Sequence, residues 1–539
     1  MLNLASSVVS AVATTGLTLL VTRTFHQAEA GAFFTAISAF AILVAVAGLG
    51  TNVGLTYFVA RFRSVGQEHK IPALMRTAVV PVIIASVAVG VLLIFISGPF
   101  AHLVMQGHAE SGGVTPAAVA GSLRAIALLL PFAGLLNAYL GASRGYGDMR
   151  PTAYIGQMGM PAGRLAGAMV AAGLGITALL APLWAISYIP ATVVAWLWMR
   201  RISRNRARPH APPADVPPEV AALLALSTPV QPTDSRRPAA DPGQPRSRMA
   251  RRRQASASAR DFWKFTTPRA IANTAQNILQ SVDIVLVAVI LGPKEAAVYT
   301  AATRFLVIGQ LGNVAISRSS QARFTELFTH GDRRGANVVY QATTAWLVVL
   351  LWPMFLLAVI FGPLVLEVFG RGYGTGYIVM VILGLSMLLA TVCGQVDMVL
   401  ITAGRSSWSL ANGLLTVGIN IGVDLALIPR YGITGAAIGW AIAIAVSNLM
   451  PLAQLARVFR LHPFGWGTII ACALSLVSFG VLAGAARFTL GDNATALAVA
   501  VAAGSVVYAA GLLRFRKLLR LPGMPRRLSR VFTRAGRGG

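Results

Sequence analysis

The sequence predicts an all-α integral membrane protein with about fourteen transmembrane helices. Of its 539 residues, 56% are hydrophobic and only 12% are charged, whereas soluble domains carry about 25% charged residues. Apolar runs near or above the ~20 residues that cross a bilayer recur along the whole chain. One long polar stretch, 199–264, separates six of these runs from eight that follow it. These observations exclude a soluble globular protein.

The expected spans follow the apolar runs in chain order. The first part of the chain predicts helices over 2–22, 31–60, 73–97, 117–142, 152–172 and 174–198. The second part predicts helices over 265–290, 296–325, 336–361, 376–402, 409–427 and 433–456, and then over 465–486 and 494–513. Because the opening Met1-Leu2-Asn3 carries no basic segment, we expect no cleaved signal peptide.

The positions of lysine and arginine predict the orientation of the chain. With the N-terminus in the cytoplasm, 33 of the 45 basic residues fall in inner segments and five in outer loops. When only the short loops are counted, the inner loops hold ten basic residues and the outer loops five. An even number of helices returns the basic tail to the cytoplasm. The net charge of +28 therefore indicates membrane topology and attraction to anionic inner-leaflet lipid, and we expect no nucleic-acid partner.

An internal repeat predicts the domain organisation. A shift of 266 residues superposes the first expected helix on the seventh, so that Asn3, Ser7, Ser10 and Thr14 fall on Arg269, Asn273, Gln276 and Gln280. Each series steps by 4, 3 and 4 residues and forms one stripe on its helix. We expect an N-lobe with six spans (1–198), a disordered basic cytoplasmic linker (199–264), a pseudo-symmetric C-lobe with six spans (265–457), two further helices (458–513) and a basic cytoplasmic tail (514–539).

The two polar stripes are candidates for the lining of a path between the lobes. Polar side chains are costly against lipid, so the stripes must face protein or water. Interhelical hydrogen bonding explains the hydroxyl groups of the first stripe. The seventh helix adds Asp283 to its stripe, and that density of polar groups favours a water-filled path.

Ionisable groups inside the spans are candidates for substrate and ion binding. Three are carboxylates, Asp283, Asp397 and Asp424, and six are arginines: Arg124, Arg164, Arg269, Arg304, Arg318 and Arg323. The arginine excess suits a phosphate or pyrophosphate, whose oxygens match the guanidinium fork. The carboxylates either pair with arginines or bind a coupling proton or cation. Cys393 and Cys472 lie in apolar helices without metal-ligand spacing, and we expect no metal or cofactor.

Two short motifs carry a resemblance to a known family. Gly48-Leu49-Gly50 leads to Tyr57-Phe58-Val59-Ala60-Arg61, and Asp283 precedes Leu291-Gly292-Pro293-Lys294-Glu295-Ala296-Ala297-Val298-Tyr299. With these motifs the chain resembles the polysaccharide-export, O-antigen-flippase-like members of the multidrug/oligosaccharidyl-lipid/polysaccharide (MOP) exporter superfamily. The resemblance implies two six-helix lobes around a central cavity, often with two extra helices. The long basic linker departs from the short connection of that family.

The resemblance implies that the chain flips an undecaprenyl-pyrophosphate-linked saccharide across the bacterial cytoplasmic membrane by alternating access. By residue type and placement, Arg164, Arg269 and Arg304 would bind the pyrophosphate. Polysaccharide polymerases or other envelope-assembly proteins are expected partners. The alternative is a cation-coupled multidrug exporter of the same superfamily. An enzyme is disfavoured, because the outer loop 98–116 offers only His102, His108 and Glu110, too few for a catalytic site.

Overall fold

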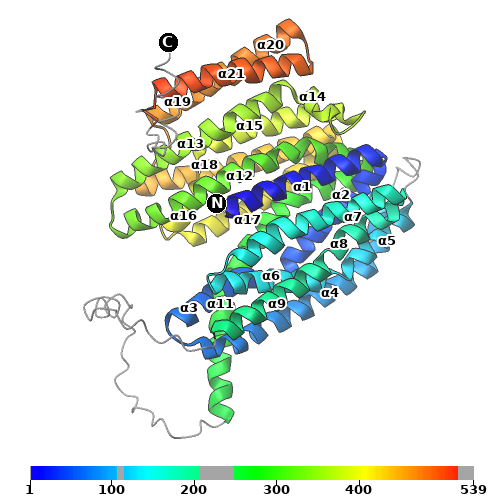
Figure 1. Cartoon of the computed structure of the whole chain (residues 1–539), viewed down its shortest axis with the longest axis vertical. Coiled ribbons are helices and arrows are strands. Elements are labelled where there is room, and N and C mark those ends of the chain that lie inside the picture. The colour runs from blue at the N-terminus through cyan, green and yellow to red at the C-terminus, as the bar shows by residue number, and fades with distance from the viewer. Residues whose placement is uncertain (1, 106–114, 207–247, 517, 520–539) are drawn as a thin grey trace.

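The computed structural model describes residues 2–105, 115–206, 248–516 and 518–519. The described residues fold into helices, with no strand among them, so the predicted all-α fold is confirmed (Figure 1). Within the described ranges, twelve helical segments are long and apolar enough to cross a membrane. The expected spans 152–172 and 296–325 are also helical, but they are not among the twelve. The count of fourteen is therefore not confirmed.

The helices up to residue 206, here called the N-terminal half, follow the predicted spans, although several spans are divided into shorter helices, as at the break inside 31–60. They are α1 (Leu2–Thr24), α2 (Gln27–Ala47), α3 (Thr51–Ser64), η1 (Glu68–Lys70), α4 (Ile71–Met105), α5 (Pro116–Ala127), α6 (Leu130–Gly145), η2 (Thr152–Gly159), α7 (Met160–Leu174), η3 (Thr177–Leu179), α8 (Leu180–Ile186) and α9 (Tyr188–Arg206). The break divides the expected helix 31–60 into α2 and α3. There Leu49 and Gly50 have positive φ angles of 48° and 64°, which an α-helix cannot contain.

The helices of residues 248–459, here called the C-terminal half, are α11 (Arg248–Leu291), α12 (Pro293–Thr329), α13 (Arg333–Ile360), α14 (Gly362–Glu367), η4 (Tyr373–Gly376), α15 (Tyr377–Cys393), α16 (Val396–Thr402), α17 (Ser406–Tyr431) and α18 (Ile433–Phe459). Four further elements follow: α19 (Trp466–Ser475), η5 (Leu476–Val481), α20 (Leu482–Leu490) and α21 (Ala494–Arg514). Of these, α19, η5 and α20 pack against α13, and α21 packs on the other three. The Tyr508 hydroxyl of α21 donates to the Val349 carbonyl of α13 (2.9 Å).

The ends of the predicted linker 199–264 are helical rather than disordered. Helix α9 continues to Arg206, and α11 already begins at Arg248. Residues 207–247 lie outside the described residues. The prediction failed at these ends because arginine, which gives the stretch its basic character, is also a good helix former.

The two halves meet along α2, which packs against both α11 and α12. Helix α12 begins at Pro293, 266 residues after the first residue of α2, Gln27. We call this end of the helices the outer end, after the predicted orientation. At the outer end a Cβ on Gly31 would lie 1.6 Å from the Pro293 carbonyl oxygen. Only glycine permits this approach of the two backbones.

Two hydrogen bonds join the halves at the same end. The Arg23 Nε donates to the Val368 carbonyl (2.7 Å), and the Gln27 amide donates to the Arg371 carbonyl (3.3 Å). Farther along α2, the Thr274 hydroxyl of α11 donates to the Ala45 carbonyl (3.2 Å). The halves are therefore held together at the outer end and along α11.

Candidate functional site

The polar stripe of α11 lies where the two halves meet. This helix contacts α2, α3 and α4 of the N-terminal half and α12, α17 and α18 of its own half. Four of its polar side chains are exposed: Arg269, Asn273, Gln276 and Gln280. They fall on one face of the helix, at the 4, 3 and 4 spacing that the sequence predicted. The chain thus presents an exposed polar face within a candidate membrane span.

The polar stripe of α1 is bonded within its own half. The hydroxyl groups of Ser6 and Ser7 both donate to the Gln157 side-chain oxygen, at 2.5 and 3.3 Å. The Thr14 hydroxyl donates to the carbonyl of Ser10 one turn earlier (2.7 Å). Ser7, Ser10 and Thr14 are all half-buried. These contacts match interhelical and backbone hydrogen bonding, so the two related stripes differ in their surroundings.

Arg164 of α7 lies in an aromatic cage inside the N-terminal half. Its guanidinium carbon is 4.3 Å from the ring centroid of Trp184 and 5.1 Å from that of Tyr188. The Arg164 Nη2 also donates a hydrogen bond to the Tyr188 hydroxyl (2.5 Å). Phe40 packs edge-on against Trp184 and closes the cage. The guanidinium is thus already engaged by the protein, through cation–π contacts that desolvation strengthens.

The described interactions of Arg269 and Arg304 are with residues of their own helices. Arg269 is exposed; its guanidinium lies 3.7 Å from the Phe265 ring centroid and donates to the Phe265 carbonyl. Arg304 is half-buried, and its Nε donates to the Thr300 carbonyl of the preceding turn (3.1 Å). Among the described residues, no carboxylate forms an ion pair with either of them or with Arg164. No described hydrogen bond or ion pair links the three arginines to one another.

Asp283 and Asp424 come together although they are far apart in the sequence. Asp283 of α11 is 4% exposed and Asp424 of α17 is fully buried, and their carboxyl groups lie in contact. The Tyr299 hydroxyl donates to Asp283 (2.9 Å). The Asn420 amide donates to Asp424 (3.3 Å). Three helices, α11, α12 and α17, therefore contribute to one buried oxygen cluster.

This carboxylate cluster is incompletely satisfied. One carboxylate oxygen of Asp283, one of Asp424 and the amide oxygen of Asn420 are buried without a hydrogen-bond partner among the described residues. No described lysine or arginine pairs with either carboxylate. Two buried carboxylates in contact repel each other unless a proton or a cation lies between them. A set of oxygen ligands alone suits a hard cation rather than a thiol-seeking metal.

Gly439 of α18 provides the space for this cluster. A Cβ at that position would lie 1.9 Å from a carboxylate oxygen of Asp424. Asp397, the third carboxylate of the predicted set, lies elsewhere: it is exposed in the first turn of α16 and accepts a hydrogen bond from the Ser409 hydroxyl (2.5 Å). The structure therefore joins two of the three predicted coupling residues and separates the third.

The sequence signals for this cluster were incomplete. The four-residue spacing of Asn412, Thr416, Asn420 and Asp424 predicted a polar face on α17, and all four are buried. No spacing linked that face to Asp283, which is 141 residues away. Tyr299 is the last residue of the Leu291–Tyr299 motif, but its contact with Asp283 depends on how α12 packs beside α11.

Comparisons with known proteins agree with this architecture. The MatE family model matches residues 4–169, and no curated protein matches the sequence. The solved lipid II flippase MurJ, in an inward closed conformation, is 12% identical with a TM-score of 0.68, over 96% of this chain and 99% of that one. An inward-facing multidrug resistance MATE family transporter of the MOP superfamily is 15% identical with a TM-score of 0.58, over 84% of this chain and 96% of that one.

A MOP superfamily transporter from Pyrococcus furiosus is also similar, at 15% identity and a TM-score of 0.51, over 84% of this chain and 94% of that one. At such low identities the likeness shows the fold alone. The chain therefore has the fold of the MurJ and MATE transporters, as the predicted two-bundle architecture required. The sequence resemblance to O-antigen flippases in particular is not confirmed.

Proposed function

We propose that this chain is a transporter that flips an undecaprenyl-pyrophosphate-linked saccharide across the bacterial cytoplasmic membrane by alternating access. The observation that supports the proposal most directly is the exposed polar face of α11, a helix that contacts both halves; this face includes Arg269. A guanidinium without a carboxylate partner suits a pyrophosphate headgroup. The transporter fold favours this reading over an enzyme.

Arg269 and Arg304 are the preferred ligands for the pyrophosphate. Their described interactions are with Phe265 and Thr300 of their own helices, so that no described side chain of another helix holds either guanidinium. Arg164 has a secondary role in this proposal, because the aromatic cage and Tyr188 already hold its guanidinium. The saccharide headgroup would pass between the halves while the prenyl chain stays in lipid.

The carboxylate cluster supplies a coupling site. A proton or a small cation at Asp283 and Asp424 would neutralise their repulsion, and its release would weaken the contact between α11 and α17. Because α11 also carries the exposed polar stripe, the ionic state of the cluster would act directly on the substrate-facing helix. Sodium and a proton are both compatible with these oxygens.

The competing proposal is a cation-coupled multidrug exporter with the same fold. The carboxylate cluster is equally compatible with it. The exposed stripe of α11 favours the flippase, because its exposed members include Arg269, whereas Asp283, the carboxylate predicted on the same face, is buried and could not directly attract an organic cation. We further propose that both termini are cytoplasmic, that the basic segments contact anionic lipid, and that a polysaccharide polymerase or another envelope-assembly protein receives the product.

Lipid-linked sugars in a deletion strain and its complemented parent test the proposal. We expect an undecaprenyl-pyrophosphate saccharide to accumulate in the inner leaflet of the deletion strain and to return to its normal level on complementation. Mass spectrometry of the extracted lipids identifies the saccharide. An unchanged lipid pool, together with sensitivity to cationic dyes, would contradict the flippase and favour the drug exporter.

A further inference from the structure

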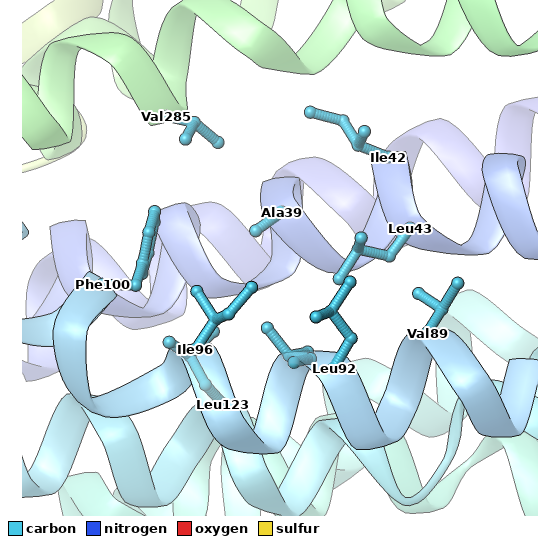
Figure 2. Close-up of a pocket in the computed structure, with 10 residues that line it drawn as sticks. Ala39, Ile42, Leu43, Val89, Leu92, Ile96, Phe100, Leu123 and Val285 are labelled. Atoms are coloured by element: carbon cyan, nitrogen blue, oxygen red, sulfur yellow. The ribbon is translucent and has the colours of Figure 1, made fainter.

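An apolar groove of about 220 Å³ lies where α11 meets α2, α4 and α5. Figure 2 shows side chains from these helices converging on it. Ten residues line it, and each is an alanine, valine, leucine, isoleucine or phenylalanine. Val285 is contributed by the C-terminal half and the other nine by the N-terminal half. The groove is therefore a hydrocarbon-walled site built from both halves.

The groove opens toward the lipid-facing side of α4. Its floor is formed by Leu123, which is fully buried, and Leu93, which is 9% exposed, whereas Leu92 at its rim is 55% exposed. Beyond the rim, Val91 and Phe95 continue the apolar outer face of the same helix, with Phe95 77% exposed. Since α4 belongs to a candidate membrane span, the material that covers this face is bilayer hydrocarbon.

The occupant comes from the bilayer rather than from the space between the halves. Val285 follows Gln276 by nine residues, which at ~100° per residue places them on opposite faces of α11. Val285 and Asp283, two residues apart, also point about 160° away from each other. The polar stripe and the carboxylate cluster thus lie on the far side of α11 from the groove, whereas α2 contributes Ala39, Ile42 and Leu43 to the groove itself.

We propose that one acyl chain of a membrane phospholipid binds in this groove and stabilises the present arrangement of the two halves. Carbon side chains alone offer no partner to a headgroup, and burying methylene groups from both the chain and the groove is favourable. Because the walls belong to both halves, movement of one half relative to the other changes the groove. A bound chain therefore shifts the conformational population toward the state in which the groove is formed. This inference does not depend on which substrate is carried.

Photo-crosslinking in vesicles tests the proposal. The full-length protein is reconstituted in phosphatidylethanolamine and phosphatidylglycerol that contain a trace of phosphatidylethanolamine with a diazirine near the end of one acyl chain. After illumination, we expect mass spectrometry to find the label on the peptides that contain Leu93 and Leu123. Val285→Trp fills the groove and should lower this labelling about tenfold, because at least two methylene groups lose their burial.

Val91→Trp is the matched control, since it adds the same ring on α4 outside the groove. The groove peptides of this variant should be labelled to the same extent as those of the parent protein. If Val285→Trp fails to fold, Ala39→Leu takes its place as the groove-filling variant. It adds a smaller side chain to the groove and should also lower the labelling. Undiminished labelling of a folded groove-filling variant would overturn the proposal. The proposal would also be overturned if undecaprenyl phosphate displaced the labelled phospholipid at a mole fraction ten times lower than that of the phospholipid. That result would assign the groove to the carried lipid.

Discussion

At the residue scale, the buried pair of Asp283 and Asp424 carries the coupling hypothesis. A cation that binds only the folded state stabilises it by about 2.7 kcal/mol when present at about 100 times its dissociation constant. We expect the effective cation, sodium or another, to raise the thermal midpoint of the purified protein. Asp424→Asn removes one charge at nearly constant volume and should abolish that rise.

Asp397→Asn is the matched control, because Asp397 is exposed and lies apart from the pair; it should respond to the cation as the parent does. If the coupling ion is a proton rather than a metal cation, the thermal midpoints of the parent and of both variants will not depend on the added cation. A full cation response in Asp424→Asn would contradict the proposed site.

Gly439 tests the packing of the same cluster. Gly439→Ala would bring a Cβ to 1.9 Å from Asp424, and overpacking of this kind costs about 1–3 kcal/mol. We expect a lower thermal midpoint in detergent. Gly418→Ala on α17 meets no atom within 4 Å and should leave the midpoint unchanged or slightly raised, since alanine favours a helix. Equal midpoints for the two variants would show that the cluster is not close-packed.

The two arginines Arg164 and Arg269 should respond differently to truncation. Arg269→Ala removes an exposed side chain and should change stability by less than about 0.5 kcal/mol. It should lower transport about tenfold or more, because hydrogen bonds to a charged ligand contribute about 1.5–3 kcal/mol. Arg164→Ala should also lower the thermal midpoint, because its cation–π contacts with Trp184 and Tyr188 are lost. Transport at the parent rate in Arg269→Ala would contradict the proposed pyrophosphate contact.

At the element scale, the approach of α2 to α12 controls the outer end. Gly31→Ala would push a Cβ into the Pro293 carbonyl, so the halves could not close there as observed. We expect lower transport and greater accessibility of a cysteine placed at Arg23 to a membrane-impermeant thiol reagent, in a background without Cys393 and Cys472. Gly121→Ala on α5 meets no atom within 4 Å and should behave as the parent. Unchanged accessibility in Gly31→Ala would show that this contact does not close the outer end.

The elements were largely predictable, because each membrane span satisfies its own backbone hydrogen bonds and shows as an apolar run. The 266-residue shift that superposes the first expected helix on the seventh also relates the next pair, because α12 begins at Pro293 and α2 at Gln27. The division of 31–60 into two helices was not predicted, although Gly48-Leu49-Gly50 was noted, because glycines also occur within transmembrane helices.

The candidate site was predictable only within single helices. The spacing along α11 gave the correct exposed face, since helical periodicity fixes which side chains share a face. The cage of Arg164 needed knowledge that α8 and α9 bring Trp184 and Tyr188 beside α7. The pairing of Asp283 with Asp424 likewise depends on packing between α11 and α17, which no local pattern encodes.

At the scale of the whole molecule, α11 links the parts of the account. It touches both halves, presents the polar stripe on one face, joins the carboxylate cluster, and closes the lipid-facing groove on the opposite face. A change in the ionic state of the cluster and a change in lipid occupancy would therefore act on the same helix. On the proposed function, a coupling ion, a headgroup and the bilayer would influence one conformational equilibrium through this helix.

Flipping of a lipid-linked saccharide by the purified protein tests the central claim most directly. Vesicles containing the protein and a fluorescent undecaprenyl-pyrophosphate saccharide are treated with an impermeant quencher, and the inaccessible fraction is followed with time. We expect rapid exchange between leaflets with the parent protein, and slow exchange with Arg269→Ala and with empty vesicles. No exchange with the parent protein, while the same vesicles move an organic cation, would contradict the flippase account.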